Sequence, residues 1–295
     1  MKSGFVTLIG RPNVGKSTLI NSIVGKKVAI TSNKPQTTRN IIQGIYNDEE
    51  SQIVFVDTPG IHKPSHKLGK TLNKQAYYSV NDVDIILLLV DASEELGKGD
   101  KYIIETLKEV KKPVILIINK IDKISKEEIL LKINEYKDLY EFNEIVPLSA
   151  LKKNNIETLT KVLKKYLTDT IKYYDENTYT NKTTAFVISE IVREKVFNLT
   201  DEEVPHSITC ITENIENKKE SCVINVAIIV DRDSLKKIII GKQGNKIKEI
   251  GMRSRKELEE LLGKKVYLDL FVKTIPKWRD KEKYLKEFGY TDFME

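Results

Sequence analysis

The chain has few cysteines and histidines, the residues that cross-link secreted proteins or bind structural metal ions. Only two of its 295 residues are cysteines, Cys210 and Cys222, and they do not form a CxxC pair. No cluster of histidines accompanies them. These absences exclude a disulfide framework and a zinc site of the usual spacing. We therefore expect two reduced cysteines.

Long apolar runs are also missing. The longest, Ile85–Val90 and Val114–Ile118, are far shorter than the roughly 20 residues with which a helix spans a bilayer. The first residues lead directly into an apolar segment, without the charged and apolar regions of a signal peptide. We therefore expect a cytoplasmic protein.

The residues that are present suit a globular protein of two domains. With 40% hydrophobic and 31% charged residues over 295 positions, the chain can bury a substantial core. In the first half, short apolar segments alternate with longer amphipathic stretches, which favours an α/β fold with a mostly parallel sheet. The expected strands are Phe5–Ile9, Ile41–Tyr46, Ile53–Val56, Ile85–Val90, Val114–Ile118 and Ile145–Leu148.

A glycine-rich segment follows the first expected strand and precedes a helix-compatible stretch. At such a turn backbone N–H groups converge and the helix dipole adds partial positive charge, so a phosphate chain can bind. Gly10 and Gly15 permit the tight backbone, Lys16 can reach the β- and γ-phosphates, and the Ser17 hydroxyl can ligate Mg²⁺. The expected phosphate-binding residues of this P-loop are Gly10, Arg11, Pro12, Asn13, Val14, Gly15, Lys16, Ser17 and Thr18.

A second polar motif follows the strand Ile53–Val56, at the sheet edge where parallel sheets bind ligands. The carboxylate of Asp57 can hold Mg²⁺ through water, and the N–H of Gly60 can meet a γ-phosphate. In isolation this motif would more often be a turn. The residues expected here on the phosphate side of the site are Asp57, Thr58, Pro59, Gly60 and Ile61.

Two further motifs, after Val114–Ile118 and Ile145–Leu148, favour a guanine base. A carboxylate at Asp122 can accept hydrogen bonds from guanine N1–H and the exocyclic amine, a pair that adenine does not offer. Asn119 can tie this loop to the P-loop, and a backbone N–H in the second motif can meet guanine O6. The expected guanine-binding residues are Asn119, Lys120, Ile121, Asp122, Ser149, Ala150 and Leu151.

Each motif is weak alone, but their order at successive strand ends makes a strong combined signal. The series is similar to that of translation-factor-type small GTPases. The segments GRPNVGKST, KPQTTRN and DTPGIHKP closely resemble the bacterial Era GTPase family, and the resemblance extends over the whole chain. It implies a P-loop GTPase domain over residues 1–168 that binds GTP and GDP and hydrolyses GTP slowly.

The polar segment 31–40 is expected to form the first switch loop. In related GTPases one threonine there ligates Mg²⁺ only in the GTP state, and we assign this role to Thr38, with Ser17 and Asp57 as the other ligands. Ile61 stands where Ras-like enzymes place the glutamine that orients the attacking water. Isoleucine cannot do this, so backbone groups or a K⁺ ion near Asn13 are the alternatives, and no catalytic residue is assigned.

Residues 169–183 lack sustained apolar periodicity and are expected to link two domains. Over 184–295 the order helix, strand, strand, helix, GxxG loop, helix, strand resembles a type II KH domain, a smaller α+β domain that binds RNA. Glycines let an RNA backbone approach such a loop closely. The expected elements are Ala185–Asn198, Ser207–Glu216, Ser221–Val230, Asp233–Ile239, Asn245–Leu262 and Lys265–Lys273.

The distribution of charge supports the RNA-binding prediction. The formal net charge is only +6, and a single lysine most often lies on solvated surface. Yet Ser234–Lys256 contains eight Lys and Arg residues and one acid, whereas Val196–Asp233 contains three and eight. A basic patch confined to the GxxG region is typical of a nucleic-acid surface. The expected RNA-binding residues are Lys236, Lys237, Gly241, Lys242, Gln243, Gly244, Lys246 and Lys248.

The Era resemblance implies that the KH domain binds the 3′ end of small-subunit (16S) ribosomal RNA. It further implies a monomer that acts in assembly of the 30S ribosomal subunit and in rRNA maturation, with peripheral membrane association whose extent the sequence leaves open. Two alternatives stay open. One is a GTP-dependent RNA-modification factor, although no motif of a modifying active site is visible. The other is a constitutive RNA-binding protein whose G domain only binds nucleotide.

Overall fold

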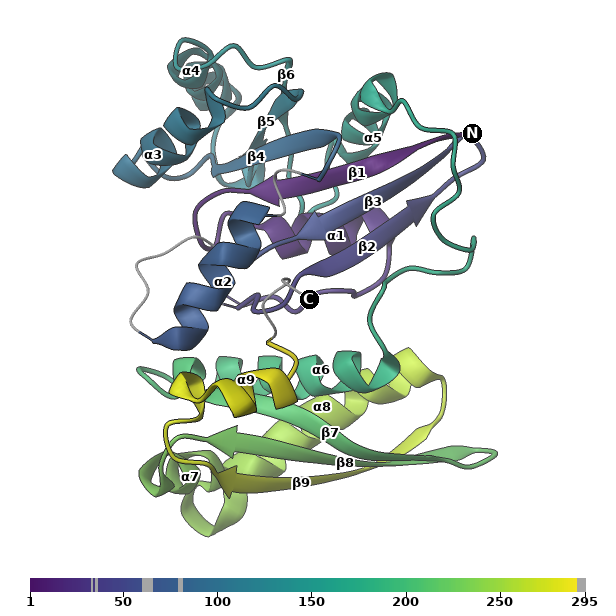
Figure 1. Ribbon diagram of the computed structural model, residues 1–295, viewed down its shortest axis with the longest axis vertical. Helices are drawn as coiled ribbons and strands as arrows, with labels where there is room; N and C mark the ends of the chain where they lie inside the picture. The colour runs from purple at the N-terminus through teal and green to yellow at the C-terminus, as the bar shows by residue number, and fades with distance from the viewer. Residues whose placement is uncertain (33, 35–36, 60–65, 79–81, 291–295) are drawn as a thin grey trace. The chain divides into compact units, whose positions relative to one another are not determined.

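The computed structural model describes residues 1–32, 34, 37–59, 66–78 and 82–290, and these form two compact units. The first unit is built mainly from residues 1–29 and 38–181, and the second mainly from residues 182–290. Each has its own sheet (Figure 1). The predicted fold class, a mostly parallel α/β domain followed by a smaller α+β domain, is confirmed.

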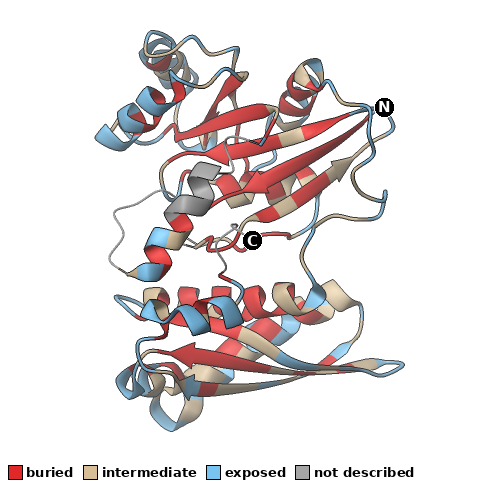
Figure 2. Cartoon of the chain, viewed as in Figure 1, coloured by how far each residue is buried: buried red, intermediate tan, exposed pale blue. Residues whose placement is uncertain are grey.

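The first unit is organised around a six-stranded sheet in the order β2-β3-β1-β4-β5-β6. All neighbouring strands pair in parallel except β2, which runs antiparallel to β3. Every residue of the central strands β4 and β5 is buried (Figure 2), as expected for strands covered on both faces. The bounds are β1 Lys2–Ile9, β2 Ile42–Asn47, β3 Ser51–Asp57, β4 Ile85–Asp91, β5 Val114–Asn119 and β6 Glu144–Pro147.

Helices cover both faces of this sheet. Helix α1 contacts β2, β3 and α5, while α3 packs Ile103, Ile104 and Leu107 into a cluster with alternate residues of β4 and β5. Because successive side chains of a strand point to opposite faces, one apolar strand can serve both layers. The helices described before residue 182 are α1 Lys16–Val24, α2 Lys67–Tyr78, α3 Lys98–Leu107, α4 Lys126–Lys137 and α5 Ile156–Tyr166.

The segment that sequence patterns predict to be a linker is hydrogen-bonded to this sheet at several points. Asp169 forms an isolated bridge with Ser3 near the start of β1, and Thr180 forms one with Gly44 of β2. The Gln52 side chain accepts from the backbone N–H groups of residues 173 and 174 at 2.8 and 2.9 Å. The unit accordingly extends to Asn181. Edge strand β2 thereby gains backbone partners that reduce its exposure to other chains.

The second unit contains a three-stranded sheet in the order β7-β8-β9, with β7 antiparallel and β9 parallel to β8. Side chains from α6, α8 and the three strands form one apolar core. The order of elements agrees with the predicted KH pattern. Their bounds are α6 Thr184–Leu199, β7 Ile208–Asn217, β8 Ser221–Val230, α7 Asp233–Ile240, α8 Asn245–Leu262 and β9 Lys265–Thr274.

The second unit continues past β9 with a short 3₁₀ turn and helix α9, Glu282–Glu287. Trp278 is fully buried, its indole N–H donates to the Ser207 carbonyl oxygen at 3.1 Å, and its ring contacts those of Phe288 and Tyr290. The tail is therefore part of the core of this unit.

Among the described residues, no helix combines the length and apolar character that crossing a membrane requires.

Candidate functional site

The predicted phosphate loop lies between the end of β1 and the start of α1. Gly10 and Gly15 have φ angles of +152° and +101°, and a Cβ atom would collide with the Leu89 carbonyl oxygen at the first and the Asn119 side chain at the second. Both positions therefore require glycine. With glycine at both positions, the backbone forms a tight turn directly before α1. The N–H groups of such a turn and of the helix start can face a bound anion.

The Lys16 side chain extends along this loop. It is 8% exposed, and its Nζ atom donates to the carbonyl oxygens of Gly10 and Arg11 at 3.3 and 3.4 Å. Burial lowers the pKa of Lys16, and the nearby Asp57 carboxylate opposes this shift. A buried ammonium held by two long hydrogen bonds gains from a closer anionic partner, and a phosphate could supply one.

Three predicted magnesium ligands lie together in the first unit. Ser17 Oγ donates to Asp57 Oδ2 at 2.6 Å, and Thr38 Oγ1 lies 3.1 Å from Ser17 Oγ and 3.3 Å from the same carboxylate oxygen. Asp57 is fully buried, and its Oδ1 atom has no hydrogen-bond partner in the described part of the chain. Burial raises the pKa of Asp57, while Lys16 lowers it. Two hydroxyls and a partly unpaired carboxylate fit a hard divalent cation.

The predicted base loops and the phosphate loop are tied together by side chains. Asn119 Nδ2 donates to the Val14 carbonyl oxygen at 2.7 Å, and its Oδ1 accepts from the Ala150 N–H at 3.0 Å. Ser149 Oγ donates to Asp122 Oδ1 at 2.5 Å, and Asp122 is exposed. Asp122 therefore has a second oxygen and an open side from which a base can approach.

Two other residues predicted to bind phosphates, Arg11 and Thr58, have side chains that bond to other parts of the first unit. The Arg11 side chain bonds to Glu94 at 2.5 Å and lies 3.0 Å from Asp100, so it faces the start of α3. Thr58 is buried, and its hydroxyl donates to the Leu8 carbonyl oxygen at 3.4 Å. The predictions for Gly60 and Ile61 lie outside the described residues.

The motifs did not include Asp91, a buried carboxylate at the end of β4. Its Oδ2 atom accepts from Lys120 Nζ at 2.5 Å. The sequence offers a signal for it, because Asp91 is the polar last residue of a buried strand, as Asp57 and Asn119 are of theirs. The position of polar residues at strand ends would have found it.

The predicted RNA-binding loop joins α7 to α8 in the second unit. Gly241 has φ +73°, and a Cβ atom there would lie 2.7 Å from Lys246 Cβ. Gly244 has φ +76°, but a Cβ atom there would meet no protein atom within 4 Å. The loop thus presents an open backbone surface at Gly244. The exposed predicted residues around it are Lys237, Lys242, Gln243 and Lys248, while Lys236 and Lys246 are partly buried.

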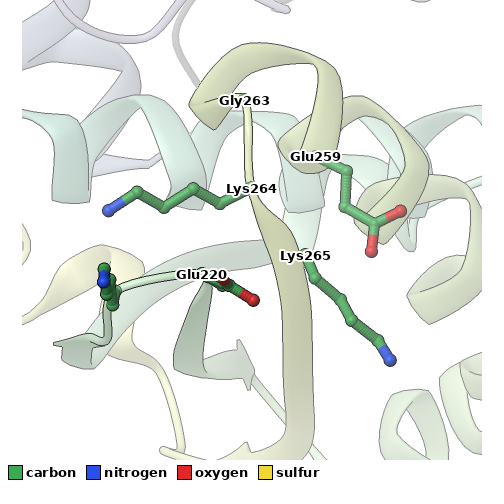
Figure 3. Close-up of a pocket in the computed structure, with 6 residues that line it drawn as sticks. Glu220, Glu259, Gly263, Lys264 and Lys265 are labelled. Carbon is green, nitrogen blue, oxygen red and sulfur yellow. The ribbon is translucent and has the colours of Figure 1, made fainter.

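A pocket lies at the opposite end of α8, where that helix meets β9 (Figure 3). Three lysines and two glutamates line it, so most of their charges cancel. It contains none of the predicted RNA-binding residues. Its lining residues are Lys219, Glu220, Glu259, Gly263, Lys264 and Lys265.

Comparison with known proteins gives matches for both units. Residues 5–120 match the family described as 50S ribosome-binding GTPase, and residues 203–279 match the KH domain family. A variant of Era from Aquifex aeolicus, crystallised with GDP and AlF₄⁻, is 44% identical with a TM-score of 0.94, over 99% of this chain and 100% of that one. A crystal structure of Era with MgGDPNP and nucleotides 1506–1542 of 16S ribosomal RNA gives the same identity and TM-score over 99% of each chain.

Proposed function

The chain belongs to the Era family of GTPases, and from this premise we propose that it hydrolyses GTP to GDP and phosphate and binds the 3′ end of 16S ribosomal RNA. The observation that carries the proposal is the 44% identity to Era over 99% of the chain, in a structure that also holds the RNA. A match to either domain alone would support only nucleotide binding or only RNA binding.

The phosphate side of the proposed mechanism depends on the P-loop and three oxygen ligands. The backbone of the loop and the Lys16 ammonium hold the β- and γ-phosphates, and Ser17, Thr38 and Asp57 hold Mg²⁺. When bound, Mg²⁺ neutralises charge that develops on the phosphate oxygens. Because catalysis of phosphoryl transfer is mostly positioning and charge stabilisation, these residues can perform it without a covalent intermediate.

On the base side, we propose that Asp122 selects guanine. Its carboxylate accepts two hydrogen bonds that only guanine among the common bases donates at that edge. Ser149 orients the carboxylate by donating to Oδ1, and Asn119 fixes the loop against the P-loop.

The remaining sequence predictions, K⁺ near Asn13 and peripheral membrane association of a cytoplasmic monomer, are part of this proposal. A comparison of hydrolysis in K⁺ and Na⁺ buffers tests the first of them.

In the second unit, we propose that the loop at Gly241–Gly244 binds the RNA backbone, and that binding serves assembly of the 30S subunit. The exposed lysines of α7 and α8 neutralise RNA phosphates, and the open space at Gly244 permits close approach of the backbone.

Fluorescence anisotropy with two labelled RNAs tests this function. One RNA ends in the 3′ sequence of 16S ribosomal RNA, and the other has the same composition in shuffled order. In the presence of Mg²⁺ and a non-hydrolysable GTP analogue, we expect the first to bind at least about tenfold more tightly, since base contacts add specificity to phosphate contacts. Equal affinity for the two RNAs would contradict the proposed target.

A further inference from the structure

Asp91 is a buried carboxylate at the nucleotide end of the sheet. It is the last residue of β4, and its side chain is 2% exposed. Strand β4 lies between β1, which leads into the phosphate loop, and β5, which leads into the base loop. Asp91 therefore stands between the two loops that would hold the two ends of one nucleotide.

The two oxygens of this carboxylate have different partners. Oδ1 accepts from the N–H and the hydroxyl of Ser93 at 3.0 and 2.7 Å, which closes a turn after the strand. Oδ2 accepts from Lys120 Nζ. Burial would raise the pKa of Asp91, but the hydrogen bonds from Lys120 and Ser93 lower it below its ordinary value. Asp91 is therefore an ionised partner of the Lys120 ammonium.

Lys120 connects this carboxylate to the phosphate loop. Besides Asp91, its Nζ atom donates to the carbonyl oxygen of Asn13 at 2.7 Å. The neighbouring Asn119 donates to the carbonyl oxygen of Val14 at 2.7 Å. Two adjacent residues of the base loop are thus hydrogen-bonded to two adjacent residues of the phosphate loop. A lysine side chain is flexible, so its place in this arrangement depends on an anchor.

We propose that Asp91 is a positioning residue for nucleotide retention. It holds the Lys120 ammonium against the Asn13 carbonyl oxygen and so keeps the base loop and the phosphate loop at the separation that one guanine nucleotide spans. The inference rests on the proposed function, because it requires that this site binds GTP and GDP. Loss of the Asp91 charge frees Lys120, and nucleotide then dissociates faster. Base choice, which is assigned to Asp122, stays the same.

The test measures the dissociation rate of a fluorescent GDP analogue from the full chain in Mg²⁺, after mixing with excess GDP. Asp91→Asn keeps the shape of the side chain and removes its charge. We expect the rate to rise at least about tenfold, as for loss of a buried charge-assisted hydrogen bond. Ser93→Ala is the matched control, because it removes a bond to the other oxygen of the same carboxylate. It should change the rate much less.

A double-mutant cycle distinguishes action through Lys120 from a general structural role. In a Lys120→Met background, Asp91→Asn should change the dissociation rate by less than about twofold, since the partner through which it acts is gone. The ratio of GDP to XDP affinity should be the same in Asp91→Asn as in the wild type. Independent, multiplying effects of the two substitutions would overturn the inference, as would an unchanged rate in Asp91→Asn.

Wild-type binding separates failure of this inference from failure of the proposed function. A wild-type chain that does not bind the fluorescent GDP analogue contradicts guanine-nucleotide binding itself. Circular dichroism and thermal melts establish whether each variant folds. Asp91→Ser, which can still bond to Ser93 but cannot reach Lys120, replaces Asp91→Asn if that variant is unfolded. Failure of both to fold would assign Asp91 a structural role and overturn the inference.

Discussion

The hydroxyl oxygens of Ser17 and Thr38 lie 3.1 Å apart, although 21 positions separate the two residues in the sequence. Both approach the same carboxylate oxygen of Asp57. Three oxygens from a helix start, a loop and a strand end thus converge at the Mg²⁺ site that we propose. This arrangement joins Thr38 of the predicted first switch loop to the proposed phosphate site.

Thr38→Ala should weaken binding of a non-hydrolysable GTP analogue in Mg²⁺ by about tenfold, the effect of losing one charge-assisted contact. Affinity for GDP should hardly change, because the threonine is expected to ligate the metal only in the GTP state. Isothermal titration with each nucleotide measures both. Thr37→Ala is the matched control, since the Thr37 hydroxyl donates to the Lys34 carbonyl oxygen. A larger effect at Thr37 than at Thr38 would transfer the assignment to Thr37.

Asp122→Asn should shift base preference from guanine toward xanthine nucleotides. The amide donates where the carboxylate accepted, and xanthine presents the complementary pattern at that edge. Competition between GTP and XTP for a fluorescent nucleotide gives the selectivity ratio, which should fall by at least about tenfold. An unchanged ratio would remove Asp122 from the base site.

Lys16→Ala should lower the affinity for GTP by at least about tenfold, because it removes a charge-assisted contact in a buried cradle. Titration with a fluorescent GTP analogue measures the effect. Lys161→Ala, at an exposed position of α5, is the control for loss of a positive charge from the same unit. Wild-type affinity in Lys16→Ala would contradict the P-loop assignment.

Gly244→Asp should weaken binding of the 3′-end RNA at least about tenfold, because a negative side chain then meets RNA phosphates. Nucleotide affinity should stay nearly unchanged, since the substitution lies in a unit with its own core. Anisotropy measures RNA binding, and a thermal melt reports folding.

Gly263→Asp is a close control for this substitution. Gly263 also has a left-handed φ, +63°, and a Cβ atom there would meet nothing within 4 Å. It ends α8 at the far end of that helix, beside the pocket of Figure 3. Strain and added charge are thus similar in the two variants. Equal loss of RNA affinity in both would contradict a specific role of the GxxG loop.

The sequence best predicted the parts of the candidate site in which a polar motif stands at the end of a strand. The order of apolar segments predicted the sheet, and parallel strands bring their ends together, so the assembly of Ser17, Asp57 and Asn119 at one edge could be foreseen. In the same way, the order of the predicted elements placed the GxxG loop between two helices.

Features that depend on distant tertiary contacts could not be foreseen. Thr180 pairs with Gly44 of the edge strand β2, which lies far away in the sequence. The segment around Thr180 has no apolar periodicity from which this pairing could be predicted. The ion pair between Asp91, at the end of β4, and Lys120, directly after β5, depends on two side chains that meet across the ends of adjacent strands, and no single motif predicts it. Trp278 is buried by packing within the second unit, whereas its neighbours in sequence are mostly charged.

Phosphate release from GTP and from ATP, with Mg²⁺ or EDTA and with or without the 3′-end RNA, tests the central claim most directly. The mass of the RNA is recorded at the end of each reaction. We predict slow, Mg²⁺-dependent release from GTP, none from ATP, and an RNA of unchanged mass that the protein binds. RNA binding without any release of phosphate, or a chemically altered RNA, would contradict the assignment of this chain as an RNA-binding GTPase.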